Sequence, residues 1–76
     1  MIKKDAYFKQ KDIHKGVVNW HYYQITDTLG EKMIVVQLAW EADGQRWREI
    51  DKPFEIDKSF VLELESRGEI VFREQA

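Results

Sequence analysis

The fold of this protein is decided by residues 17–50, VVNWHYYQITDTLGEKMIVVQLAWEADGQRWREI. Aromatic and β-branched residues dominate this stretch, and two turn signals divide it into three runs that are each typical of a β-strand. The first signal is the sequence Thr28-Leu29-Gly30-Glu31. The second is Ala42-Asp43-Gly44-Gln45, whose Asp-Gly pair favours a type I′ hairpin. We therefore predict a three-stranded antiparallel meander over about 17–27, 32–42 and 45–50.

Two-residue loops at both turns would fix which side chains share a face of this meander. The middle strand then presents an apolar row to the expected core face, namely Ile34, Val36, Leu38 and Trp40, with Trp40 opposite Trp47. The opposite face is predicted to carry Trp20, Tyr22, Arg46 and Arg48. A shift of one residue in either hairpin would exchange the two faces of the strand concerned, because side chains alternate with a period of two.

The residues after Pro53 fit either a helical or a strand period. In the helical interpretation, over about 58–67, Asp57 is the N-cap, Ile56 packs on Val61, and Gly68 ends the helix. In the alternative, 60–65 and 69–73 form a hairpin, and the protein is an all-β SH3-like or partly open barrel. We favour the helix because three separate signals agree on its ends. A C-terminal strand over about 69–73 is expected in both cases.

The segment 6–15 is ambiguous in the same way. Asp5 before it and Gly16 after it suggest a helix over Ala6–Lys15, but its apolar stripe is narrow, and a strand over Ala6–Lys9 is the alternative. The whole chain, 1–76, is expected to be a single domain, because so short a chain can bury only one core. The predicted fold class is α+β and mainly β.

Composition and charge narrow the classes of function. The chain has no cysteine, so it has neither a disulfide framework nor a thiolate zinc site, and it lacks the apolar runs of a secretion signal or a membrane span. We expect a cytoplasmic protein with no membrane partner. The net charge is −2, but residues 1–26 carry five lysines against two aspartates, whereas residues 27–76 carry twelve acids against seven bases. A nucleic-acid partner is disfavoured because no domain-wide basic character is present.

The supply of catalytic groups is poor. His14 and His21 are the only histidines, and the carboxylates form no convincing pair in the sequence. Metal-ligand spacings, a phosphate-binding glycine loop and a nucleophile elbow are all missing. We therefore predict that the protein is not an enzyme, and we predict no catalytic residue, metal, cofactor or small-molecule substrate.

The leading functional hypothesis is a non-enzymatic protein–protein interaction module or a small accessory or inhibitory protein. Its predicted partner-binding residues are Trp20, Tyr22, Arg46 and Arg48, and the same face would serve self-association as a homodimer. One alternative is single-stranded nucleic-acid binding, in which bases stack on Trp20 and Tyr22. Another is an acidic mimic that blocks a basic site on a partner. A structural alternative also stands, in which Trp20 and Tyr22 are covered as a second core layer.

Overall fold

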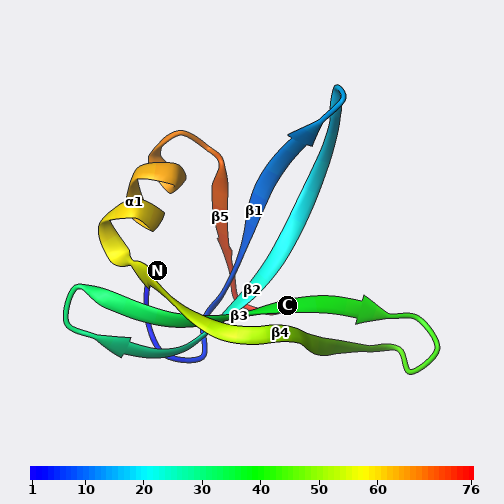
Figure 1. Ribbon diagram of the computed structural model, residues 1–76, viewed down its shortest axis with the longest axis horizontal. Helices are drawn as coiled ribbons and strands as arrows, with labels where there is room; N and C mark the ends of the chain where they lie inside the picture. The colour runs from blue at the N-terminus through cyan, green and yellow to red at the C-terminus, as the bar shows by residue number, and fades with distance from the viewer.

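Figure 1 shows the computed structural model, which describes residues 1–76. Its elements, in chain order, are β1 (Tyr7–His14), β2 (Val17–Leu29), β3 (Lys32–Glu41), β4 (Arg46–Asp57), α1 (Lys58–Ser66) and β5 (Ile70–Arg73). The five strands form one antiparallel sheet in the order β4-β3-β2-β1-β5, so β4 and β5 are its edges and the sheet is not closed into a barrel. The predicted mainly β class and the meander β2-β3-β4 are confirmed.

The structure resolves the choice between helix and strand for both ambiguous segments, 6–15 and 58–67. The segment 6–15 contains strand β1, so a helix over Ala6–Lys15 is wrong; Phe8 is buried and pairs with Tyr23 of β2. The segment 58–66 is helix α1, so the favoured helix is confirmed, and the SH3-like alternative with a strand over 60–65 is wrong. The reason is the spacing of Val61 and Leu64, which are both buried, as a helical period requires.

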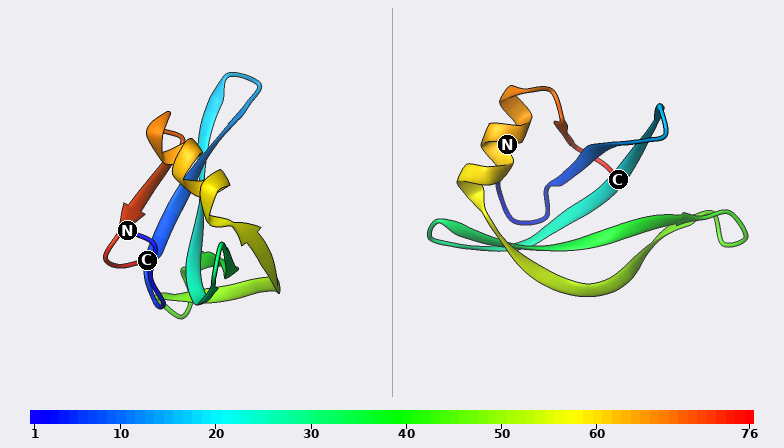
Figure 2. Two further views of the ribbon diagram at one scale, coloured as in Figure 1. Left: turned by 90° about the vertical axis from the view of Figure 1, so that its left-hand side faces the viewer. Right: turned by 45° about the horizontal axis from the view of Figure 1, so that its top comes forward.

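The core lies between α1 and one face of the sheet, at the end of the molecule where β2 turns into β3 (Figure 2). Phe8, Ile25 and Val35 come from the sheet, and Val61 and Leu64 come from the helix. Ala6, Met33 and Ile70 complete the cluster. Burial of each large apolar side chain contributes about 1.5–3 kcal/mol to the free energy of unfolding.

The two ends of α1 are fixed differently. Gly68 follows the helix with φ of +76°, and its N–H donates to the carbonyl of Glu65 at 2.9 Å, so the expected terminal glycine is confirmed. Asp57 stands at the N-cap but its side chain makes no capping hydrogen bond. Instead, the Asp57 carboxylate forms an ion pair with Lys32, and the N–H of Lys58 donates to the carbonyl of Glu31. These contacts attach the start of the helix to the β2–β3 turn.

A β-bulge at Thr26 interrupts the pairing of β2 with β3. The pairs on either side of it are Ile25 with Val35 and Asp27 with Ile34. Thr26 is therefore an extra residue in β2, and its hydroxyl donates a hydrogen bond to the carbonyl of Ile34 at 3.3 Å.

This bulge exchanges the two faces of the first part of β2. Leu29 pairs with Lys32, so the turn still has two residues but lies one residue later than expected. Beyond the bulge, Tyr22 rather than His21 lies opposite Leu38. Trp20 and Tyr22 consequently share the face of Leu38 and Trp40, which contradicts the predicted alternation.

The second hairpin has the predicted register but not the predicted turn. Trp40 pairs with Trp47, as counting requires. Neither Asp43 nor Gly44 has the positive φ of a type I′ turn, and Gln45 takes φ of +49° instead. The expected core face holds only in part: Val36 and Leu38 of that row are buried, but the main cluster lies on the face of Val35 and α1, and Trp40 remains 54% exposed.

The sheet divides at the end away from α1. β2 pairs with β3 only from Tyr22 to Leu29, so residues 17–21 pair with β1 alone. In Figure 1 the β1–β2 hairpin and the β3–β4 hairpin diverge beyond this shared segment. No helix is both long and apolar enough to cross a membrane.

Candidate functional site

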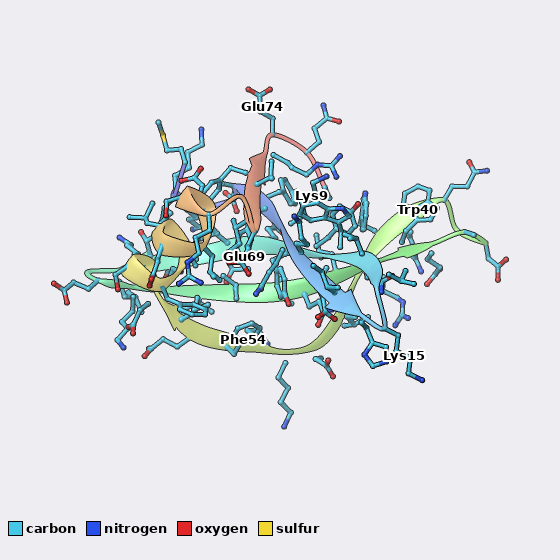
Figure 3. The ribbon with its side chains drawn as sticks, turned by 90° about the horizontal axis from the view of Figure 1, so that it is seen from above. Lys9, Lys15, Trp40, Phe54, Glu69 and Glu74 are labelled. Atoms are coloured by element: carbon cyan, nitrogen blue, oxygen red, sulfur yellow. The ribbon has the colours of Figure 1, made fainter.

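The face of the sheet opposite α1 carries a cluster of large aromatic side chains. We call it the aromatic face and define it by Trp20, Tyr22, Trp40 and Trp47. The four residues come from three adjacent strands, β2, β3 and β4; Tyr22, Trp40 and Trp47 meet where the two hairpins begin to diverge, and Trp20 lies on the β1–β2 side of the divergence. Figure 3 shows Trp40 and Lys9 on one side of the molecule and Phe54, which packs on the core side, on the other.

Three rings of the aromatic face, those of Tyr22, Trp40 and Trp47, contact one another across the strands. The centroids of Tyr22 and Trp47 are 4.8 Å apart, and those of Trp40 and Trp47 are 5.6 Å apart with the ring planes at 66°. Such tilted pairs are favourable beyond the area that they bury. Leu38, which lies opposite Tyr22, is only 6% exposed although α1 is on the other side of the sheet. The aromatic rings therefore form a small apolar layer of their own.

Cationic side chains lie directly beside these rings. The Lys9 ammonium is 4.2 Å from the centroid of the Trp20 ring, and the Lys11 ammonium is 6.0 Å from it. The Arg73 guanidinium is 5.3 Å from the centroid of Tyr22. The strand pairing explains this arrangement, because Lys11 is the partner of Trp20 and Lys9 is the partner of Tyr22. Each such contact is worth about 0.5–1 kcal/mol at an exposed site.

The charge of this part of the sheet is positive although the protein is negative overall. Between the levels of Trp20 and Gln24, the face carries Lys9, Lys11 and Arg73 against Glu49 of β4, and Glu69 adjoins Lys11 at the β5 edge of the sheet. Asp27 and Glu55 lie farther along the same face, beyond Val36 and near the β2–β3 turn. The net charge of the chain is −2, so the positive region is local and adjoins the aromatic rings.

The four residues predicted to form one site are not brought together. Trp20 and Tyr22 lie on the aromatic face, whereas Arg46 and Arg48 lie on the opposite face of β4. There, Arg46 and Arg48 form ion pairs with Glu41 at 3.3 and 3.0 Å. The expectation that these four residues share one face is therefore wrong, and the physical reason is the bulge at Thr26.

Sequence reasoning missed most of the cluster that does form. Trp40 and Trp47 were assigned to the core, and Lys9, Lys11 and Arg73 were not connected with any aromatic residue. The usable signal was the alternation of Lys9 and Lys11, which places both on one face once the segment is a strand. The alternation of Lys9 and Lys11 cannot assign them to one face of a sheet while the segment 6–15 is equally compatible with a helix.

The opposite face carries a short polar chain around His21. Its Nε2 lies 3.3 Å from the Asp12 carboxylate, and its Nδ1 lies 3.4 Å from the Gln37 amide nitrogen. Burial, together with the charge of Asp12, raises the pKa of the neighbouring Tyr23 phenol above its ordinary value. The two side-chain partners of His21 are thus a carboxylate and an amide.

Two hollows mark the surface, and neither contains a set of metal ligands. The larger, of about 580 Å³, lies between the N-terminal segment and β5 and includes Lys3, Lys4 and Arg73 as well as Asp5 and Glu74 in its lining. Arg73 thus borders both this hollow and the aromatic face. No group of three or more histidine, cysteine, aspartate or glutamate side chains is placed to hold a metal ion.

Comparison of the chain with known protein families, with curated proteins and with solved structures finds no match.

Proposed function

We propose that this protein binds single-stranded nucleic acid on the aromatic face. The observation that carries the proposal is the placement of Lys9, Lys11 and Arg73 within 4.2 to 6.0 Å of the Trp20 and Tyr22 ring centroids. Proteins that bind single strands combine aromatic side chains, on which bases stack, with cations that follow the phosphates. Both components are present here on one uncovered side of a sheet.

Base stacking and phosphate contacts would both contribute to the free energy of binding at this face. Stacking of one base on an aromatic side chain contributes about 1–3 kcal/mol. The exposed Trp40 ring offers a free surface for stacking, and its neighbours Trp47 and Tyr22 lie within ring contact of one another. The cations add a salt-dependent term, because each neutralised phosphate releases counterions.

The bulge at Thr26 separates the aromatic residues of β2 from Glu41. With the predicted register, Trp20 and Tyr22 would lie beside Arg46 and Glu41, and no continuous positive region would adjoin them. In the structure Glu41 lies on the other face with Arg46, while Trp20 and Tyr22 adjoin the lysines of β1. The negative remainder of the protein would then orient a polyanion toward the one positive region.

The test is a titration of the intrinsic tryptophan fluorescence with oligothymidylate at low salt. We expect a quench that weakens as salt is added, and we expect Trp40→Leu to weaken binding. Phe60→Leu, which removes an exposed aromatic ring from α1, is the matched control and should bind as the wild type does. Absence of any quench at low salt would contradict the proposal.

A second candidate is docking of a protein through the same face, with a second copy of the chain as the simplest partner. It is favoured by three exposed aliphatic side chains, Ile13, Val18 and Val71, which extend the aromatic face. A homodimer would cover these with a single surface. Sedimentation equilibrium at high micromolar concentration distinguishes the candidates: a dimer that Ile13→Ser and Val18→Ser dissociate would support self-association.

A further inference from the structure

The cations and the aromatic rings of this site come from different strands. Lys9 and Lys11 belong to β1 and Arg73 belongs to β5, whereas the rings that define the aromatic face belong to β2, β3 and β4. Since the sheet order is β4-β3-β2-β1-β5, the cations form a band along β1 and β5, and the rings adjoin it on the other side, with Trp20 and Tyr22 along β2 and Trp40 and Trp47 as a pair across β3 and β4. Two acids adjoin these side chains: Glu49 lies on β4, at the side away from the cations, and Glu69 lies beside Lys11, where its carboxylate pairs with Arg67.

The cations are also regularly placed along the strand direction. Lys11 is at the level of Trp20, Lys9 at the level of Tyr22, and Arg73 at the level of Tyr7, which is two residues farther along β1. Successive levels are therefore two residues, or about 6.6–6.8 Å, apart in a strand. Beyond this band, Arg73 also borders the hollow that is lined by Lys3 and Lys4 together with Asp5 and Glu74.

We infer that a bound single strand lies parallel to β1, with its phosphates along Lys11, Lys9 and Arg73 and its bases directed across β2 toward Trp47 and Trp40. This inference rests on the proposed function and adds the orientation of the ligand. The opposite orientation would bring phosphates to Glu49 and bases to the lysines. A base-paired duplex is excluded from this mode, because its bases are not free to reach the rings while its phosphates contact the adjoining band.

The first experiment measures binding of oligothymidylate as a function of salt for two variants. Lys9→Gln with Lys11→Gln is expected to reduce the slope of log K against log salt by about 1.4, since each phosphate contact on a single strand contributes about 0.7. Trp40→Leu is expected to leave the slope unchanged and to weaken binding about 5- to 150-fold, the equivalent of one lost stacking contact. The matched control is Lys52→Gln with Lys58→Gln, which removes two charges from elsewhere and should preserve the slope.

The second experiment keeps the wild-type protein and changes the ligand. A strand of abasic sites with the same phosphates is expected to shift the NMR resonances of the Lys9 and Lys11 side chains. It should leave the indole N–H resonances of Trp40 and Trp47 in place, whereas oligothymidylate should shift both sets. This comparison needs no variant and so does not depend on whether the substituted chains fold.

The outcomes separate the two proposals. If the wild type does not bind oligothymidylate at low salt, the proposed function fails. If it binds, but Lys9→Gln with Lys11→Gln changes the slope no more than the control variant does, the orientation is wrong and the function stands. An abasic strand that moves the indole resonances of Trp40 and Trp47 as oligothymidylate does would also overturn the orientation.

Discussion

Tyr22 lies directly opposite Leu38 across the β2–β3 pairing, and this one relationship places Trp20 and Tyr22, with their β1 partners Lys11 and Lys9, on the face of Trp40 and Trp47. The register follows from Thr26, which has no partner in β3. The hydroxyl of Thr26 stabilises the bulge through its hydrogen bond to the carbonyl of Ile34.

Substitution of Thr26 by Val should therefore destabilise the fold. The methyl group that replaces the hydroxyl cannot donate a hydrogen bond, so the free energy of unfolding is expected to fall by about 0.5–1.5 kcal/mol. Urea denaturation followed by circular dichroism measures this change. Thr28→Val is the control, because the Thr28 hydroxyl makes no hydrogen bond, and it should alter stability by less than about 0.5 kcal/mol. Equal effects at both positions would show that the bulge hydrogen bond contributes nothing.

Leu64 and Leu62 should respond differently to truncation. Leu64 is 6% exposed and packs in the core, whereas Leu62 of the same helix is 50% exposed. We expect Leu64→Ala to cost about 2–5 kcal/mol of unfolding free energy and Leu62→Ala to cost less than about 0.5 kcal/mol. Thermal or urea denaturation of the two variants is the measurement. In a strand the two residues would share one face, so similar losses would contradict the helix.

Gly68 should tolerate asparagine better than alanine. Its φ of +76° is unfavourable for a residue with a Cβ atom, although no atom lies within 4 Å of the place where that Cβ would stand. Strain alone should thus lower the unfolding free energy of Gly68→Ala by about 1 kcal/mol. Asparagine enters this region of φ more readily, and Gly68→Asn should recover part of the loss in the same denaturation assay. A Gly68→Ala variant as stable as the wild type would contradict the strained geometry.

Tyr23 should make the fold less stable in alkali. Burial, and then the charge of Asp12, raises the pKa of Tyr23 above the ordinary value, which is about 10. The folded protein then holds this proton more tightly than the unfolded chain does. The associated stability is complete below pH of about 10 and is lost as the pH rises through the folded pKa.

Absorbance of tyrosinate during a pH titration, combined with urea denaturation at each pH, measures both effects. The variant Tyr23→Phe should lack the tyrosine that ionises at a raised pH, and its stability should fall less between pH values of about 10 and 11. The prediction fails if the wild type and Tyr23→Phe lose stability in parallel over that range.

Arg46 and Arg48 should not contribute to strand binding on the aromatic face. They lie on the opposite face, in exposed ion pairs with Glu41, and such pairs contribute about 0–1 kcal/mol to stability. A variant with both arginines changed to Gln should therefore bind oligothymidylate with the salt slope of the wild type in the fluorescence titration. A slope reduced as far as in Lys9→Gln with Lys11→Gln would show that the arginines contact phosphates.

The sequence contained local signals for most of the elements but none for the bulge. The second hairpin and the ends of α1 depend on residues close together in the chain, such as Asp43, Gly44, Asp57 and Gly68, and their positions were predicted. Thr26 fits a regular strand as well as a bulge, so nothing near it signals the extra residue. The face on which each residue from Val17 to Ile25 lies depends on whether β2 contains this extra residue. The predicted arrangement of the site was therefore wrong although the meander was correct.

The N-terminal segment failed for a related reason. Its choice between helix and strand depends on partners far away in the sequence, since β1 lies between β2 and β5. Phe8 packs against Tyr23 and Phe72, with ring centroids 5.1 and 5.9 Å apart. These contacts select the strand, and local propensity does not reveal them.

The divergence of the two hairpins has a thermodynamic consequence for the aromatic face. Two-stranded ribbons are only marginally stable in water; the β3–β4 hairpin is such a ribbon beyond Leu38, and the β1–β2 hairpin becomes one beyond Trp20, where β5 no longer pairs with β1. The Tyr22–Trp47 contact is then a non-covalent link between the two hairpins. The backbone hydrogen bonds of these hairpins should open more easily than those of the end covered by α1. Any molecule that binds across both hairpins would hold them together. Its binding would therefore slow amide exchange at the distant turns of the two hairpins as well as at the binding site.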